Sequence, residues 1–405
     1  MRTRRTRQFG AAALALATGA VLAGCTGSQD TAGTSAGSST LNVYLYQKPK
    51  LFSPLAPANG PDQIVMSMVF DSLLGLDSRS QLQPHLTTAQ PTVSPDARTF
   101  TFHLKPDLKW SDGKPFTSKD VLFTYNLLAN PRSGSAWVGS FAQVKGADAV
   151  KKGNADTLSG LTAPDAHTVV IKTTAPNVGA VATLGVLPLL PEHVLGSVPL
   201  DRVSKNDFFH RPTVGLGPYR FVTYKTDQYV ELKANSRFRS PVNIKRVLLK
   251  TVSSDVATAQ LGTGEMDLAQ ISPTDLPAIR KSGNVSVRGI EGIGYTRIAV
   301  NQTQKRFADV RVRQALLYAV DRKKIIDKVL AGKGTVVNSS FFGPAAPDDL
   351  NPYPYDPAKA KKLLRAAGWD ASQPVTLQWV PGQRDRDTTA TIVQSQLQAV
   401  GVKVS

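Results

Sequence analysis

The chain has few of the cysteine and histidine residues that most often carry covalent cross-links or metal sites. Cys25 is its only cysteine among 405 residues, so an intrachain disulfide is excluded and stability must come from packing and hydrogen bonds. The histidines lie far apart, without the spacing of three or four residues that places two ligands on one helical face. These are His85, His103, His167, His193 and His210. The sequence therefore predicts no metal site.

Catalytic and nucleotide-binding motifs are also missing. No phosphate-binding loop of the type G-x-x-x-x-G-K-[ST] occurs, and no G-x-S-x-G nucleophile turn occurs. Ser111 and Lys114 formally match S-x-x-K, but Gly113 and Pro115 favour a reverse turn over the helical turn that this motif requires. We therefore predict a protein that is not an enzyme and that needs no cofactor.

Acidic residues are few. The chain has 48 Lys and Arg against 30 Asp and Glu, a formal net charge of +18, and 41% of its residues are hydrophobic, as in a globular protein. The basic residues are spread along the chain after residue 7, and no nucleic-acid-binding motif accompanies them. This pattern argues against nucleic acid as a partner and favours attraction to an anionic envelope.

The N-terminus has an apolar run too short to span a bilayer, preceded by a basic segment. Leu22, Ala23 and Gly24 followed by Cys25 resemble a bacterial lipobox. We expect a signal peptide at residues 1–24, a lipid on Cys25 and a location at the cell membrane, anchored on its extracytoplasmic face. An ordinary signal peptide with an incidental cysteine is the alternative. The pair Arg4 and Arg5 resembles a twin-arginine signal, so the choice between Sec and Tat export stays open. Residues 25–40, rich in Gly, Ser, Thr and Ala, are expected to form a flexible tether.

The rest of the chain alternates strand and helix patterns, which predicts an α/β fold. Alternating strand-forming residues favour strands at 41–46, 99–104, 167–172, 247–251, 267–271 and 285–287, and a hairpin of 219–222 with 229–232. Helical periodicity with capping residues favours helices at 63–74, 117–128, 256–261, 310–330, 356–367 and 388–400. A last strand is expected from residue 402.

Several sequence blocks, in order, resemble the extracytoplasmic solute-binding proteins of family 5, which serve peptide and nickel ABC transporters. The blocks cover residues 69–74, 100–105, 108–121, 191–194, 214–219, 307–316, 318–322, 355–357 and 360–364. The most characteristic reads LKWSDGKPFTSKDV, at residues 108–121. Within it, Trp110 is expected to be a packed aromatic under the turn at Asp112 and Gly113.

The resemblance implies a periplasmic-binding-protein-like fold of the three-lobe peptide-binding type, with mixed sheets and a hinge. Lobe I would comprise residues of about 41–58 and 166–294, lobe II about 59–165 and lobe III about 295–405. The implied function is capture of peptides outside the membrane, by a monomer, for delivery to the permease subunits of an ABC importer. An oligosaccharide, a nickel complex, haem, or an envelope interaction without transport remain alternatives.

Family members usually run more than a hundred residues beyond the point that corresponds to Ser405, so we expect lobe III to be incomplete there. The segment beyond would normally carry the acidic residue that pairs with the amino terminus of the peptide. Within this chain, loops that follow strands at lobe boundaries offer candidate ligand contacts. These candidates are Tyr46, Gln47, Trp137, Tyr295 and Asn301.

Overall fold

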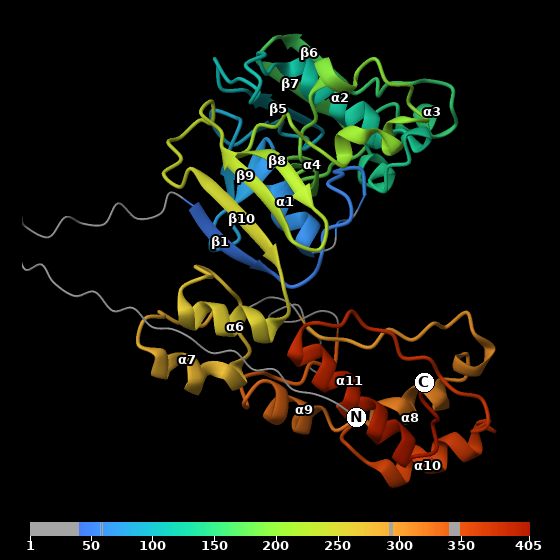
Figure 1. Ribbon diagram of the computed structural model, residues 1–405. Helices are drawn as coiled ribbons and strands as arrows, with labels where there is room; N and C mark the ends of the chain where they lie inside the picture. Colours follow the sequence, from blue (N-terminus) through green and yellow to red (C-terminus); the bar gives the residue numbers. More distant parts are fainter. Residues whose placement is uncertain (1–39, 57, 59, 291–294, 340–348) are drawn as a thin grey trace, which may run out of the picture. The chain divides into compact units, whose positions relative to one another are not determined.

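Strand β1 (Thr40–Leu45) opens the folded part of the chain and forms one edge of a four-stranded mixed sheet. The computed structural model describes residues 40–56, 58, 60–290, 295–339 and 349–405 (Figure 1). Residues 39–405 form one unit. The predictions for the signal peptide, Cys25 and nearly all of the tether lie outside the described residues.

The first sheet has the order β1-β10-β9-β8. Its other strands are β8 (Tyr219–Lys225), β9 (Tyr229–Ala234) and β10 (Arg246–Thr251). β1 runs parallel to β10, whereas β10 with β9 and β9 with β8 are antiparallel. The strands predicted at 41–46 and 247–251 and the predicted hairpin are therefore confirmed, because their period-2 patterns bury one face of each strand.

A second sheet, of order β4-β5-β7-β6, packs against helix α2 (Figure 1). Its strands are β4 (Thr92–Val93), β5 (Thr99–His103), β6 (Leu161–Asp165) and β7 (Thr168–Lys172). β6 and β7 form a hairpin, and β7 also pairs with β5. A lobe boundary between residues 165 and 166 would divide this hairpin, whereas the pairing keeps both strands in one sheet.

Helix α2 (Ser118–Ala129) begins at the predicted cap. The Thr117 side chain accepts a hydrogen bond from the backbone N–H of Lys119, and the Asp120 carboxylate accepts one from the backbone N–H of Thr117. This reciprocal capping satisfies N–H groups that have no partner within the helix. Burial raises the pKa of Asp120, although the N–H groups of Thr117 and Glu192 favour its charged form.

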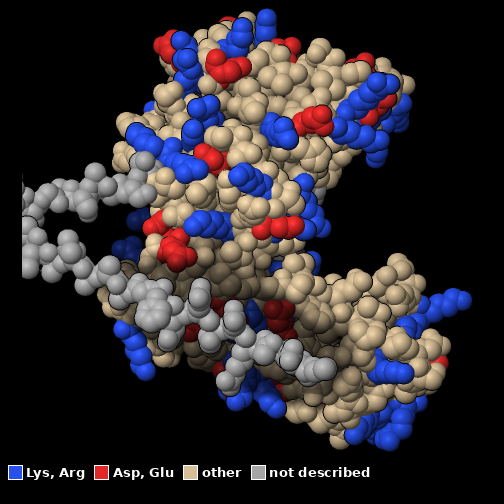
Figure 2. Space-filling model, viewed as in Figure 1, with Lys and Arg blue, Asp and Glu red and all other residues tan. Residues whose placement is uncertain are grey.

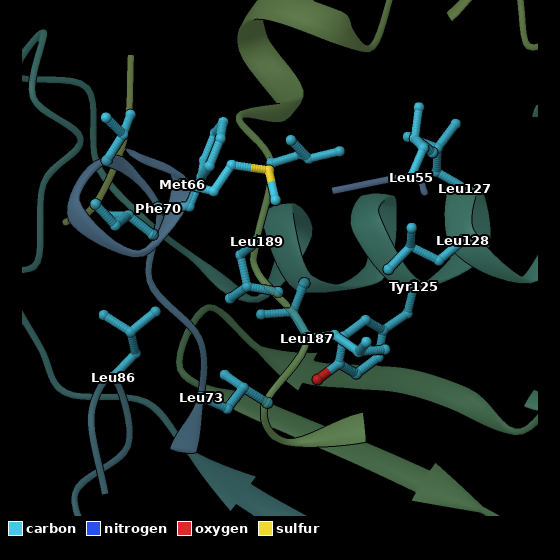
Figure 3. Close-up of a cluster of buried hydrophobic side chains, with 14 of the residues drawn as sticks. Leu55, Met66, Phe70, Leu73, Leu86, Tyr125, Leu127, Leu128, Leu187 and Leu189 are labelled. Atoms are coloured by element: carbon cyan, nitrogen blue, oxygen red, sulfur yellow. The ribbon is translucent and has the colours of Figure 1, made fainter. Parts of the chain in front are cut away.

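The largest apolar core joins residues of the two sheets with those of α1 (Gly60–Val69) and α2. Figure 3 shows part of it, where Met66 and Phe70 lie near Leu187 and Leu189. Trp110 is fully buried, with its ring packed edge-on against Phe116, so the prediction that it is a packed aromatic is confirmed.

The C-terminal part of the chain has its own core, built on four helices. These are α8 (Val310–Ala319), α9 (Arg322–Val329), α10 (Pro357–Ala366) and α11 (Arg384–Ala399). The single helix predicted over 310–330 is wrong. Val320 is extended, and the Asp321 side chain accepts a hydrogen bond from the N–H of Lys324 at 2.9 Å, which caps a new helix.

The remaining elements are short. They are β2 (Leu74–Leu76), β3 (Leu82–Pro84), α3 (Ala147–Lys151), α4 (Gly179–Leu184), α5 (Glu192–Leu195), α6 (Ser254–Thr263) and α7 (Leu276–Ser282). α1 ends at Val69 rather than near residue 74, because the chain turns there into β2. The strands predicted at 267–271, 285–287 and from 402 are not formed as strands: Leu268 makes one bridge to Val43, and Val404 makes one to Val375.

Within the described ranges, every helix is too short or too polar to cross a lipid bilayer.

Candidate functional site

The carboxyl end of β1 meets the start of α6 and the segment that leads into α11. Tyr44, on β1, is 7% exposed, and its hydroxyl has no hydrogen-bond partner among the described residues. Burial, together with the charges of Asp255 and Asp385, raises the pKa of Tyr44 to about 12. A buried hydroxyl without a partner is rare in folded proteins and marks this region as a place where polar groups converge.

Arg384, at the start of α11, links this helix to two other segments, which carry Asp255 and Asp275. Its Nη1 atom pairs with Asp275, and its Nε atom donates to Asp255 Oδ1 at 2.9 Å. The side chain of Asp275 is 10% exposed, whereas that of Asp255 is 65% exposed. The nearby carboxylates raise the pKa of Arg384 against the opposing effect of its burial. Arg384 is thus held by two carboxylates that come from segments remote in the sequence.

Two further bonds hold the start of α11 and the loop before it in the same place. Ser272 Oγ donates to Asp385 Oδ1 at 2.6 Å, and the N–H of Ser254 donates to the carbonyl of Gly382 at 3.1 Å. Asp387 accepts hydrogen bonds from Trp379 Nε1 at 2.8 Å and from the N–H of Gly382 at 3.2 Å. Trp379 stays 47% exposed, so this loop presents an aromatic surface beside a carboxylate.

Tyr46 closes the arrangement from the β1 side. The guanidinium carbon of Arg386 lies 5.5 Å from the centre of the Tyr46 ring, within the range of a cation–π contact. A Cβ atom on Gly60 would lie 1.9 Å from the Tyr46 hydroxyl oxygen, so only glycine allows the ring to take this position. We call the following residues the junction site: Tyr44, Tyr46, Asp255, Asp275, Arg384, Asp385, Arg386 and Asp387.

The junction site has the opposite charge to the chain as a whole. Its four carboxylates face two guanidinium groups, a formal charge of −2, whereas the chain carries +18. Carboxylates in excess can bind a cationic group of a ligand. The site can therefore receive a positively charged ligand end beside aromatic side chains.

The predicted contact residues divide between this site and other segments. Tyr46 belongs to the site, and Gln47 follows it and is half-buried. Trp137 was singled out as an exposed aromatic, but it is half-buried and packs on the main core. Its Nε1 atom donates to the carbonyl of Pro54 at 2.7 Å, so the premise of exposure is wrong.

Tyr295 and Asn301 lie on the segment that enters the C-terminal helices, and both are exposed. The guanidinium carbon of Arg297 lies 5.9 Å from the centre of the Tyr295 ring. Asn301 Oδ1 accepts hydrogen bonds from the N–H and the hydroxyl of Thr303, as in a local turn. Cys25 lies outside the described residues.

Sequence reasoning missed the charged members of the junction site. The alternation Arg384, Asp385, Arg386, Asp387 at the start of a helix was the available signal, because it places both signs of charge in one turn. Among the residues that the structure describes, no group of three His, Cys, Asp or Glu side chains is arranged to hold a metal ion.

Comparison with known proteins defines the class to which this fold belongs. The sequence profile of the bacterial extracellular solute-binding proteins, family 5 Middle, matches residues 81–405. The chain belongs to this family, and the fold predicted from the sequence resemblance is confirmed by solved structures.

Particular relatives are similar over most of the chain. A Brucella ovis protein named as an ABC transporter peptide-binding protein is 31% identical over 361 residues, which are 87% of this chain and 65% of the relative. The oligopeptide-binding protein AppA of Bacillus subtilis, solved with a nonapeptide, has a TM-score of 0.82 at 25% identity. The match covers 90% of this chain and 73% of the AppA chain. NikZ of Campylobacter jejuni, solved with Ni(L-His), has a TM-score of 0.78 at 26% identity. The match covers 91% of this chain and 73% of NikZ. The chain thus spans about two thirds of the length of these curated relatives.

Proposed function

We propose that this chain captures peptides outside the cytoplasmic membrane and delivers them to the permease subunits of an ABC importer. It acts as a monomeric binding protein without enzymatic activity or cofactor, and a lipid on Cys25 anchors it to the membrane. Family membership and the names of the relatives support this proposal, as does the resemblance of residues 22–25 to a lipobox.

The acidic junction site is the observation that carries the peptide proposal. The family resemblance places the usual acidic partner of a peptide amino terminus beyond Ser405. Within this chain, the carboxylate excess at the end of β1 matches the one positive charge of that terminus, and we propose it as the partner. Asp385 and Asp387 lie in the first turn of α11, next to the loop that carries the exposed ring of Trp379, which offers an apolar surface for a side chain. An extended peptide would add backbone hydrogen bonds, which are independent of its sequence.

The residues predicted from the sequence fit this proposal unequally. Tyr46 and Gln47 lie at the junction site and are proposed contacts, as are the exposed Tyr295 and Asn301. Trp137 would contact a ligand only through the part of its ring that the core leaves exposed, because Nε1 is bound to Pro54. We therefore rank Trp137 below the other four.

A thermal-shift assay of the full chain in detergent, against pooled peptides of two to eight residues, tests the proposal. A ligand at 100 times its dissociation constant stabilises the folded state by about 2.7 kcal/mol, which raises the melting temperature of a chain this size by about 3 °C. Peptide pools should produce this shift, and oligosaccharides, Ni(L-His) and haem should not. A shift with one of these instead, and none with peptides, would replace the peptide assignment.

A further inference from the structure

One face of the first sheet carries basic residues directly opposite one another. Arg220 on β8 is paired in register with Lys233 on β9, and Lys233 is paired with Arg246 on β10. Directly opposed residues lie about 5 Å apart, so like charges in this arrangement repel each other. Three adjacent strands therefore place positive charge in one row.

A second row repeats the pattern further along the same strands. Lys225 on β8 and Lys250 on β10 both pair with Tyr229 on β9, and the Lys225 ammonium lies 5.5 Å from the centre of that ring. The opposite face of each strand is apolar and buried, with Phe221 and Leu249 in the core, which directs the basic side chains outward. We call Arg220, Lys225, Lys233, Arg246 and Lys250 the basic sheet face.

At the β1 edge this face is covered and lies beside acidic residues. Tyr44 of the junction site is paired with Lys250 and is buried against α6, and Lys250 Nζ donates to the carbonyl of Glu265 at 3.2 Å.

Little acidic charge balances the part of the face on β8 and β9. Glu231 is the only acidic residue within β1, β8, β9 and β10, and it pairs with Arg246 at 2.9 Å. At the β1 edge, Asp267 is already held by the N–H and the side chain of Asn42. Figure 2 shows Lys and Arg side chains over the region where Figure 1 places these strands, with some Asp and Glu side chains among them. Arg220, Lys225 and Lys233 are exposed, whereas Arg246 and Lys250 are half-buried. The exposed basic residues on β8 and β9 are complementary to an anionic surface.

The position of the face in the chain indicates which anionic surface it meets. β1 begins at Thr40, which is paired with Arg246, so the first basic row adjoins the point where the tether enters the fold. The tether from Cys25 to Thr40 contains 15 peptide links and spans at most about 50 Å when extended. A lipid on Cys25 would thus keep this sheet close to the phospholipid headgroups.

We propose that the basic sheet face docks on the anionic phospholipid surface of the membrane to which the chain is anchored. The docked state orients the protein on the bilayer by electrostatic attraction, and the tether supplies the high local concentration. This inference rests on the lipid anchor of the proposed function. It requires no contact with peptide or permease.

The test uses the full lipidated chain in vesicles whose lipids carry a headgroup quencher. A Val222→Cys substitution places a fluorescent label on the basic sheet face, and Val178→Cys, at a side chain 72% exposed beside α4, provides a control label. Vesicles with 30% phosphatidylglycerol should quench the label at position 222, whereas pure phosphatidylcholine should not. Salt at 1 M should abolish the quenching, since it shortens the Debye length to about 3 Å.

Charge variants complete the experiment. Each basic side chain near an anionic surface contributes about fivefold to binding, so Arg220→Gln with Lys233→Gln should lower the ratio of docked to undocked protein about thirtyfold. The matched pair Lys151→Gln with Lys152→Gln, exposed at the end of α3, should leave it unchanged. Equal quenching in both lipids, or equal effects of both pairs, would overturn the proposal. Labelling of Cys25 in the unsubstituted chain would instead show that the lipid anchor is missing.

Discussion

Replacing the partners of Arg384 one at a time should separate a buried ion pair from an exposed one. Asp275→Asn removes a charged partner whose side chain is 10% exposed, and we expect it to lower the free energy of unfolding by about 2 kcal/mol. Asp255→Asn removes a partner that is 65% exposed, and solvent screening should limit its cost to less than about 1 kcal/mol. Arg384→Gln leaves both carboxylates unpaired and should cost about 3 kcal/mol.

Double-mutant cycles in urea, followed by far-ultraviolet circular dichroism, measure these couplings. The cycle of Arg384→Gln with Asp275→Asn should give a coupling energy of about 1–2 kcal/mol, and the cycle with Asp255→Asn less than about 0.5 kcal/mol. A coupling to Asp255 equal to or greater than that to Asp275 would refute the reasoning, because burial would then not determine the strength of the pair.

Three further outcomes follow from individual side chains. Trp110→Ala should cost about 3–5 kcal/mol in thermal unfolding, since the ring is fully buried, whereas Trp379→Ala should cost far less at 47% exposure. Thr117→Ala removes one half of the capping box and should cost about 1 kcal/mol in urea unfolding. Arg246 lowers the pKa of Glu231 through their hydrogen bond, so this pair stabilises the fold above the unfolded-state pKa near 4.3, and the contribution is lost as pH falls through the lowered value. Arg246→Gln should raise the pKa of Glu231 in an NMR titration; an unchanged value would contradict the pairing.

The parts of the fold that local signals determine were predictable. The hairpin of β8 and β9 has a period-2 pattern in each strand, and Thr117 with Asp120 has the spacing of a capping box, so each feature depends on residues close in sequence. The helix over 310–330 was mispredicted because Asp321, inside an apolar periodic stretch, caps a new helix instead of continuing the first. Periodicity alone does not register such a break.

The charged junction could not be predicted, because its partners are remote in the sequence. Arg384 is separated from Asp255 by 129 positions and from Asp275 by 109. Tyr46 was found only because it ends a predicted strand, and nothing in its surroundings indicated the cation–π contact with Arg386. Trp137 was misjudged because a loop rich in small residues suggested exposure, whereas its indole N–H binds Pro54 across 83 positions.

The proposed function has the acidic junction site receive the amino terminus of a peptide. Calorimetric titration of one bound peptide, with its amino terminus free and then acetylated, tests this most directly in the full chain and in Asp385→Asn. We expect acetylation to weaken binding to the unsubstituted chain by at least about tenfold, as for the loss of a charged hydrogen bond, and we expect Asp385→Asn to remove most of this difference. The variant Asp370→Asn, at an exposed carboxylate bonded to Ser372, should behave like the unsubstituted chain. Equal affinity for the free and acetylated peptides would contradict the claim.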